Sequence, residues 1–241
     1  MQYAIDRNDS KLADSILKSI SPEIKESPLY RNQYGRYLLL TQQYEEALPY
    51  LKGAYESEPS FFHLSQVNNA YLGLLKPEEA ISYIDKHLEV TPDDALAKML
   101  KADVLMWTKP DEAIEEYKRL LITYPKNAVA MNNVAWLYMQ KDDYNMARTY
   151  ALQAVDLFPK NANFLDTLAL TYLKEKDFTT ASSLLKVAVE NNPSDINVYF
   201  NYAESLYGQG KSGDAVATLK RITTTDPKLI EIIRLKIEKY R

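Results

Sequence analysis

The stretch "AVAMNNVAWLYMQKDDYNMARTYALQAVDLFPKN" (residues 128–161) decides the fold. It holds two apolar segments of helical length, separated by the polar residues "QKDD" (140–143), and Pro159 follows the second segment. Apolar residues spaced three and four apart predict amphipathic helices. Proline cannot continue a helix, so Pro159 marks the end of the second one. This stretch therefore predicts a hairpin of two helices.

The hairpin recurs along the chain of 241 residues. Prolines that correspond to Pro159 lie 33 or 34 residues apart, and these are Pro59, Pro92, Pro125, Pro159, Pro193 and Pro227. A constant period of this length is typical of stacked helical hairpins. Six units follow, at residues 28–60, 61–93, 94–127, 128–161, 162–195 and 196–227.

Aligned on these prolines, taken as position 32, the units share columns of small residues. Position 20 is alanine in all six units: Ala47, Ala80, Ala113, Ala147, Ala181 and Ala215. Position 8 is small in four: Gly35, Ala135, Ala169 and Ala203. Two helices can approach closely only where the side chains at their crossing are small, because protein interiors are densely packed. These columns therefore mark the helix crossing.

Helix starts are also marked in the sequence. Asn127, Asn161 and Ser194 lie just after repeat prolines, where an N-cap is expected. Pro77 and Pro110 lie where second helices should begin, and the first helical turn tolerates proline.

The alanine column at position 20, the small residues at position 8 and the proline at position 32 resemble the tetratricopeptide repeat family over residues 28–227. The resemblance implies an all-α, right-handed superhelical solenoid of antiparallel helix pairs. Residues 1–27 are interpreted as a partial N-terminal repeat, because Ala13 falls where a position-20 alanine would be. Residues 228–241 are interpreted as a C-terminal capping helix.

The tetrapeptide Gly-Lys-Ser-Gly at residues 210–213 invites a nucleotide-binding interpretation, which its context opposes. The phosphate-binding loop requires a glycine five residues before Gly210, where the chain has Ser205, and a preceding strand. In the repeat alignment this segment is the turn between two helices. His63 and His87 lack metal-ligand spacing, and the paired acids lie in first turns of helices, which favour negative charge. We therefore expect no enzyme activity, no cofactor and no metal.

Composition limits the classes of partner. The net charge is −4, with 29 basic and 33 acidic residues, which opposes a nucleic-acid partner. No apolar run approaches the length of a membrane span, and no secretory signal is visible. The absence of cysteine fits a cytoplasm and a periplasm or cell envelope equally well, so the compartment stays open.

The preferred function is a protein–protein interaction scaffold, since the resemblance implies that the first helices line a concave groove for a partner peptide. Position 6 of the first helices is an amide in four units, and an amide can pair with both polar groups of an extended backbone. Trp136 would add an apolar anchor. The predicted groove residues are Gln33, Gln66, Asn69, Asn132, Asn133, Trp136 and Asn201.

Two alternatives stay open. One is self-association into a homodimer through the half-repeat at residues 1–27. The other is RNA binding, because a second helical-hairpin family has a similar period, although its groove is basic. The run Leu-Asp-Thr-Leu-Ala at 165–169 also resembles bacterial proteins of exopolysaccharide export and envelope assembly.

The alanine column generates a first prediction. Ala147→Leu and Ala181→Leu should each lower the free energy of unfolding by about 1–3 kcal/mol, because the crossing has no room for a larger side chain. Denaturant unfolding measures this change. Unchanged midpoints in both variants would contradict the assignment of the crossing.

Overall fold

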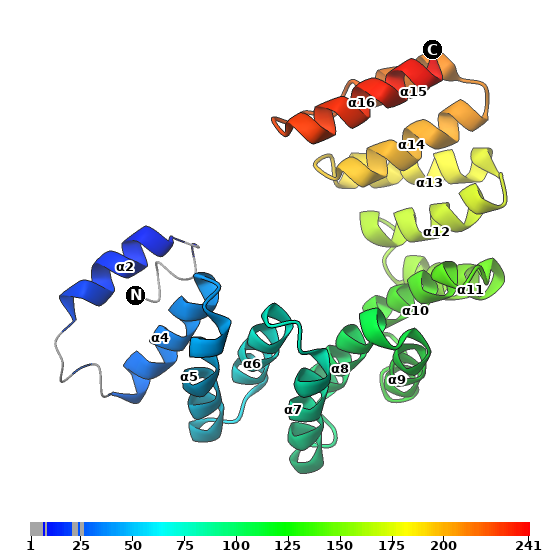
Figure 1. Ribbon diagram of the computed structural model, residues 1–241. Helices are drawn as coiled ribbons and strands as arrows, with labels where there is room; N and C mark the ends of the chain where they lie inside the picture. Colours follow the sequence, from blue (N-terminus) through cyan, green and yellow to red (C-terminus); the bar gives the residue numbers. More distant parts are fainter. Residues whose placement is uncertain (1–6, 8, 21–23, 25–26) are drawn as a thin grey trace. The chain divides into compact units, whose positions relative to one another are not determined.

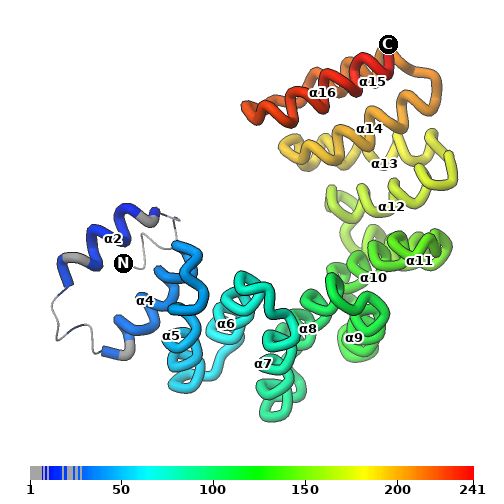
Figure 2. Tube along the Cα trace, viewed as in Figure 1, coloured from blue at the N-terminus to red at the C-terminus, as the bar shows by residue number. Residues whose placement is uncertain are grey.

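A computed structural model describes residues 7, 9–20, 24 and 27–241, and it is shown as a ribbon and as a trace (Figures 1 and 2). Within this described part every regular element is a helix, which confirms the predicted all-α fold. The helices are α2 (Ser10–Ser19), α4 (Pro28–Leu40), α5 (Tyr44–Ser57), α6 (Phe61–Gly73), α7 (Pro77–Val90), α8 (Ala95–Thr108), α9 (Pro110–Thr123), α10 (Ala128–Gln140), α11 (Tyr144–Leu157), α12 (Ala162–Lys174), α13 (Phe178–Asn191), α14 (Ile196–Gly208), α15 (Ser212–Leu219) and α16 (Pro227–Tyr240).

The chain forms two compact units, divided within α9 after Glu116. In unit 1, residues 1–116, the first helices α4, α6 and α8 lie side by side, and the second helices α5 and α7 pack between them. Unit 2, residues 117–241, repeats this arrangement with the first helices α10, α12 and α14 and the second helices α11, α13 and α15. Each unit therefore has one face that is built by first helices.

The helix crossings lie where the alanine column predicts them. All six alanines at position 20 are fully buried: Ala47, Ala80, Ala113, Ala147, Ala181 and Ala215. Ala135, Ala169 and Ala203, opposite them at position 8, are fully buried as well. Large side chains beside the crossings, such as Leu51 and Leu185, complete the core.

The third hairpin replaces the small residue at position 8 with Lys101. Its ammonium group lies 2.7 Å from an Asp85 carboxylate oxygen and 3.6 Å from a Glu116 oxygen. These two partners raise the pKa of Lys101 despite the opposing effect of burial, which is the largest single influence on it. In this hairpin an ion-pair cluster therefore accompanies the fully buried Ala113 at the crossing.

Five first helices end in the same turn. Position 15 adopts a left-handed backbone at Gln42, Leu75, Asp142, Lys176 and Gly210. The next backbone N–H then donates to the carbonyl oxygen of position 11, as Lys211 does to Leu206 at 3.0 Å. This is the Schellman pattern of helix ends. The Gly-Lys-Ser-Gly segment is thus an inter-helix turn, as its place in the repeat predicts.

The predictions about helix starts are confirmed with one exception. Asn127 and Asn161 cap α10 and α12, and Pro77 and Pro110 open α7 and α9. Ser194 does not cap α14, because the Asp195 carboxylate accepts from the backbone N–H of Asn197 instead.

Pro227 was expected to end the second helix of the sixth hairpin, and it does not. The helix α15 already ends at Leu219, and Pro227 occupies the first turn of α16, which tolerates a proline because its N–H needs no helical partner.

Both ends of the chain carry the expected additional helices where they are described. Ala13 of α2 is fully buried against α4, near Tyr37, and residues 1–6, 8, 21–23 and 25–26 of the predicted partial repeat lie outside the described residues. The predicted capping helix is α16. Its Tyr240 is buried and stacks on Tyr207 with ring centroids 4.4 Å apart.

Two helical glycines of unit 1 provide a matched test of the packing. An added Cβ at Gly35 would lie 2.9 Å from the Tyr50 Cβ and 3.1 Å from the Leu51 Cδ2, whereas one at Gly53 would meet nothing within 4 Å. We expect Gly35→Ala to destabilise the protein by about 1–3 kcal/mol. Gly53→Ala should stabilise it by about 0.5–1 kcal/mol, because alanine favours a helix. Urea unfolding of both variants decides this, and shifts of the same sign would contradict it.

Candidate functional site

The candidate binding face of unit 2 is built by α10, α12 and α14. Four of the predicted groove residues belong to it. Asn132, Asn133 and Trp136 lie on α10 and Asn201 lies on α14, and all four side chains are partly exposed. All four therefore lie on first helices of this unit, and their role in binding stays a prediction.

Two of these amides have partners within the unit. The Asn133 Nδ2 donates to the Tyr117 hydroxyl oxygen at 3.0 Å, and the Asn201 Nδ2 donates to the Asp166 Oδ1 at 2.8 Å. The Asn132 Oδ1, in contrast, is buried and accepts no hydrogen bond from the described residues. The row therefore differs from the series of equivalent amides that the sequence suggested.

Asp166 is the residue of this face that sequence reasoning missed. It lies at position 5 of α12, and its side chain is only partly exposed. Burial raises the pKa of Asp166 to about 6, the Asn201 hydrogen bond opposes the rise, and the negative charge of Asp195 adds to it. A carboxyl group inside an amphipathic helix "ANFLDTLALTYLK" (162–174) was the only signal in the sequence.

In unit 1 the predicted residues lie on α4 and α6. Gln33 and Gln66 are partly exposed and Asn69 is exposed. The Gln33 Oε1 accepts from an Arg36 guanidinium nitrogen at 3.4 Å. The seven predicted residues are thus distributed over the first-helix faces of both units, three in unit 1 and four in unit 2.

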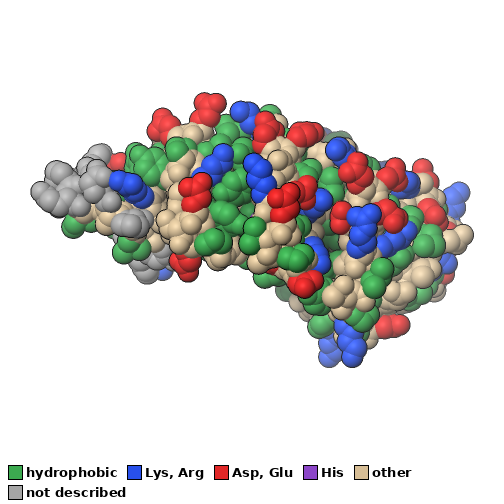
Figure 3. Space-filling view, turned by 90° about the horizontal axis from the view of Figure 1, so that it is seen from below, with side chains coloured by type: hydrophobic (Ala, Val, Ile, Leu, Met, Phe, Trp, Pro, Cys, Tyr) green, Lys and Arg blue, Asp and Glu red, His purple; other side chains and the backbone are tan. Residues whose placement is uncertain are grey.

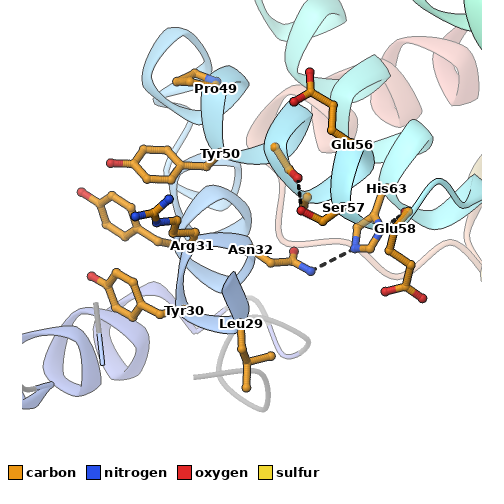
Figure 4. A pocket seen from close by; sticks show the side chains of 13 residues that line it. Leu29, Tyr30, Arg31, Asn32, Pro49, Tyr50, Glu56, Ser57, Glu58 and His63 are labelled. Carbon is orange, nitrogen blue, oxygen red and sulfur yellow. Dashed lines mark hydrogen bonds between the residues drawn. The ribbon is translucent and has the colours of Figure 1, made fainter. Parts of the chain in front are cut away.

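Unit 1 also holds a pocket of 1010 Å³ between the start of α4 and the outer side of α5 (Figure 4). Tyrosines form much of its wall. The rings of Tyr30 and Tyr34 stack with centroids 5.7 Å apart, and the Tyr50 ring meets Tyr34 edge-on at 5.1 Å. Burial and the neighbouring phenols raise the pKa values of Tyr30 and Tyr34. The sequence shows many tyrosines but does not reveal that these three meet.

His63 lines the pocket, and hydrogen bonds hold its ring in place (Figure 4). The His63 Nδ1 lies 2.8 Å from the Glu58 carbonyl oxygen, so this nitrogen carries the proton. The His63 Nε2 then accepts from the Asn32 Nδ2 at 2.9 Å. The Asn32 Oδ1 is left buried without a hydrogen-bond donor among the described residues. His63 thus has a structural role, as the sequence predicted.

His87 is buried by its neighbours as well. Its Nδ1 lies 2.6 Å from the Tyr55 hydroxyl and its Nε2 lies 3.0 Å from an Asp94 oxygen.

Acidic and basic side chains are interspersed over the face shown in Figure 3, with apolar side chains between them. In the described part of the chain, no helix combines the length and the apolar character that a bilayer span requires.

Comparisons with known families match the second half of the chain. Residues 108–162 match the family described as tetratricopeptide repeat, and residues 140–222 match the family described as anaphase-promoting complex, cyclosome, subunit 3. No curated protein gives a significant sequence match.

Solved structures share the fold at low sequence identity. A tetratricopeptide repeat protein from Parabacteroides merdae is 17% identical, with 88% of this chain and 86% of that chain covered and a TM-score of 0.66. PilF of Pseudomonas aeruginosa is 22% identical, with 75% and 88% covered and a TM-score of 0.61. PilW, a type IV pilus biogenesis factor, is 16% identical, with 86% and 99% covered and a TM-score of 0.67.

The raised pKa of Asp166 generates a prediction about stability. A carboxyl group whose pKa is about 6 in the folded chain and near 3.8 when unfolded destabilises the fold once it ionises, and that cost is absent below pH 3.8. Asp166→Asn should therefore raise the free energy of unfolding by about 1–3 kcal/mol at pH 7.5 and by much less at pH 4.

Urea unfolding at both pH values measures this effect. Asp156→Asn, which removes an exposed carboxylate of α11, serves as the control for the change in net charge. A gain for Asp166→Asn that is the same at both pH values would show that the ionised carboxylate is not the cause.

Proposed function

We propose that this chain, which belongs to the tetratricopeptide repeat family, is a non-catalytic scaffold that binds an extended segment of a partner protein on a first-helix face. The observation that carries the proposal is the face of unit 2. It presents amides and a tryptophan, partly exposed, on the first helices α10 and α14, with α12 between them. Polar groups that pair with a backbone, beside an aromatic anchor, suit an extended peptide.

The contacts within the face refine which side chains would bind. The Asn201 Nδ2 is held by Asp166, and the Asn133 Nδ2 is held by Tyr117, so these amides are preorganised by hydrogen bonds within the unit. Preorganised polar groups lose little conformational freedom on binding. The Asn132 Oδ1 is buried and has lost its hydrogen bond to water. A donor from a bound partner that reaches this oxygen would replace that hydrogen bond.

We place the scaffold in a bacterial envelope or exopolysaccharide assembly system. Two points support this: the resemblance of residues 165–169 stated above, and the likeness in fold to PilW, a type IV pilus biogenesis factor. At 16% identity the likeness to PilW shows the fold alone. Self-association and RNA binding remain the alternatives, and the mixed-sign surface in Figure 3 favours protein over RNA.

A selection of phage-displayed random dodecapeptides on the full chain tests the proposal. For the best selected peptide, Trp136→Ala should weaken binding at least about tenfold, because tryptophans are frequent binding hot spots. Leu152→Ala, which truncates an exposed apolar residue of the second helix α11, should change the affinity less than about twofold. Calorimetry measures both, and circular dichroism confirms that both variants stay folded.

Two outcomes would overturn the proposed function. One is a selection that yields no peptide above the background of an uncoated surface. The other is a set of peptides that bind Trp136→Ala and the original chain with equal affinity, which would place binding elsewhere.

A further inference from the structure

The face of unit 2 contains a carboxylate without a cationic partner. Asp166 lies on α12, between α10 and α14, and among the described residues no basic side chain forms an ion pair with it. Its one hydrogen bond comes from the neutral Asn201 amide at 2.8 Å. Removing a carboxylate from water is costly unless it is paired, so the missing partner of Asp166 requires an explanation.

The charges around Asp166 do not supply that partner. The helix α10 carries no charged residue, and α14 carries only Glu204, with Asp195 at its N-cap. On α12 itself the one basic residue is Lys174, in the last turn and exposed. The second helices α11 and α13 also pack on α12, and their charged residues are Arg148, Asp156, Lys186 and Glu190.

None of the charges on the second helices acts detectably on Asp166, whose pKa responds to burial, to the Asn201 hydrogen bond and to the negative charge of Asp195. Of these helices' basic groups, Arg148 is paired with Glu175. The electrostatic environment of the Asp166 carboxylate would therefore be improved by a cationic group of a bound partner.

Neighbouring polar atoms are acceptors too. The Asn132 Oδ1, at the equivalent position of α10, is buried without a donor. The Thr167 hydroxyl of α12 cannot serve it, because this hydroxyl donates to the Asn163 carbonyl oxygen at 3.0 Å. Trp136 lies one helical turn after Asn132 on the same face of α10. The face thus combines a carboxylate, an unpaired amide oxygen and an aromatic ring.

We propose that Asp166, Asn132 and Trp136 form a subsite that takes an arginine or lysine side chain of the bound partner segment. This inference rests on the proposed function, because the basic side chain belongs to the segment bound there. A guanidinium or ammonium group carries several donors and no acceptor, which matches the Asp166 carboxylate and the Asn132 Oδ1. Either cation also interacts favourably with an aromatic face.

The peptides selected on the full chain provide the probe. In the best binder, each arginine is replaced by citrulline, or each lysine by norleucine, one at a time. One of these neutral replacements should weaken binding to the original chain at least about tenfold and to Asp166→Asn less than about twofold. Asp156→Asn, with the same charge change on α11, should behave as the original chain does.

The pH dependence gives a second readout. A cation binds the ionised carboxylate, and the free chain protonates Asp166 below about pH 6. Affinity for the basic peptide should therefore fall about tenfold from pH 7 to pH 5 in the original chain and stay nearly constant in Asp166→Asn.

The two proposals fail in different ways. Selected peptides that lose affinity for Trp136→Ala but need no basic residue, or whose basic residue matters equally in Asp166→Asn, would overturn the cationic subsite and leave the scaffold function intact. Peptides that ignore Trp136 altogether, or a selection that yields none, would overturn the scaffold function and the subsite with it.

Discussion

The close approach of two helices at a pair of small residues is the constraint on which the rest of the structure depends. The position-20 alanines are fully buried in all six hairpins, and in three hairpins an equally buried alanine lies opposite at position 8. A larger side chain at either place would push the helices apart and forfeit the contacts of the leucines beside them. Within each compact unit, neighbouring hairpins pack on one another, so the same constraint sets the spacing of their first helices and creates a face on which side chains one repeat apart can cooperate.

The third hairpin shows a second solution to the same constraint. Lys101 occupies the crossing, where its long apolar stem can pack while its ammonium group reaches Asp85 and Glu116. Such a pair contributes to stability only as long as both partners stay in place, because removing one leaves a desolvated charge. The division between the two compact units falls in α9 of this hairpin, directly after Glu116. The ion-paired Lys101 therefore belongs to the hairpin in which the boundary between the units falls.

The sequence predicted the repeated features well because packing imposes them in every unit. The alanine column, the hairpin turn at Gly210 and the caps at Asn127 and Asn161 all follow from local rules. Features that occur in only one repeat were harder to predict from the sequence. Asp195 displaced Ser194 as a cap because either residue can cap a helix, and α15 ended eight residues before Pro227 for no reason visible in the pattern. The tyrosine pocket and the Asp166–Asn201 contact join residues from different helices. Aligning the repeats with one another does not show which of these residues meet.

In the proposed subsite, the Asp166–Asn201 contact would give the scaffold specificity at a cost in stability. In the chain alone, Asn201 supplies one hydrogen bond to a carboxylate whose ionised form burial disfavours, and the proposed basic side chain would supply the positive charge. Had the neighbouring repeat supplied a lysine in place of Asn201, the chain would hold a satisfied ion pair and the face would have no charge preference. An amide orients the carboxylate without neutralising it. The repeat architecture suits such a proposed site, because the packing at the fully buried crossings involves other residues than those of the face.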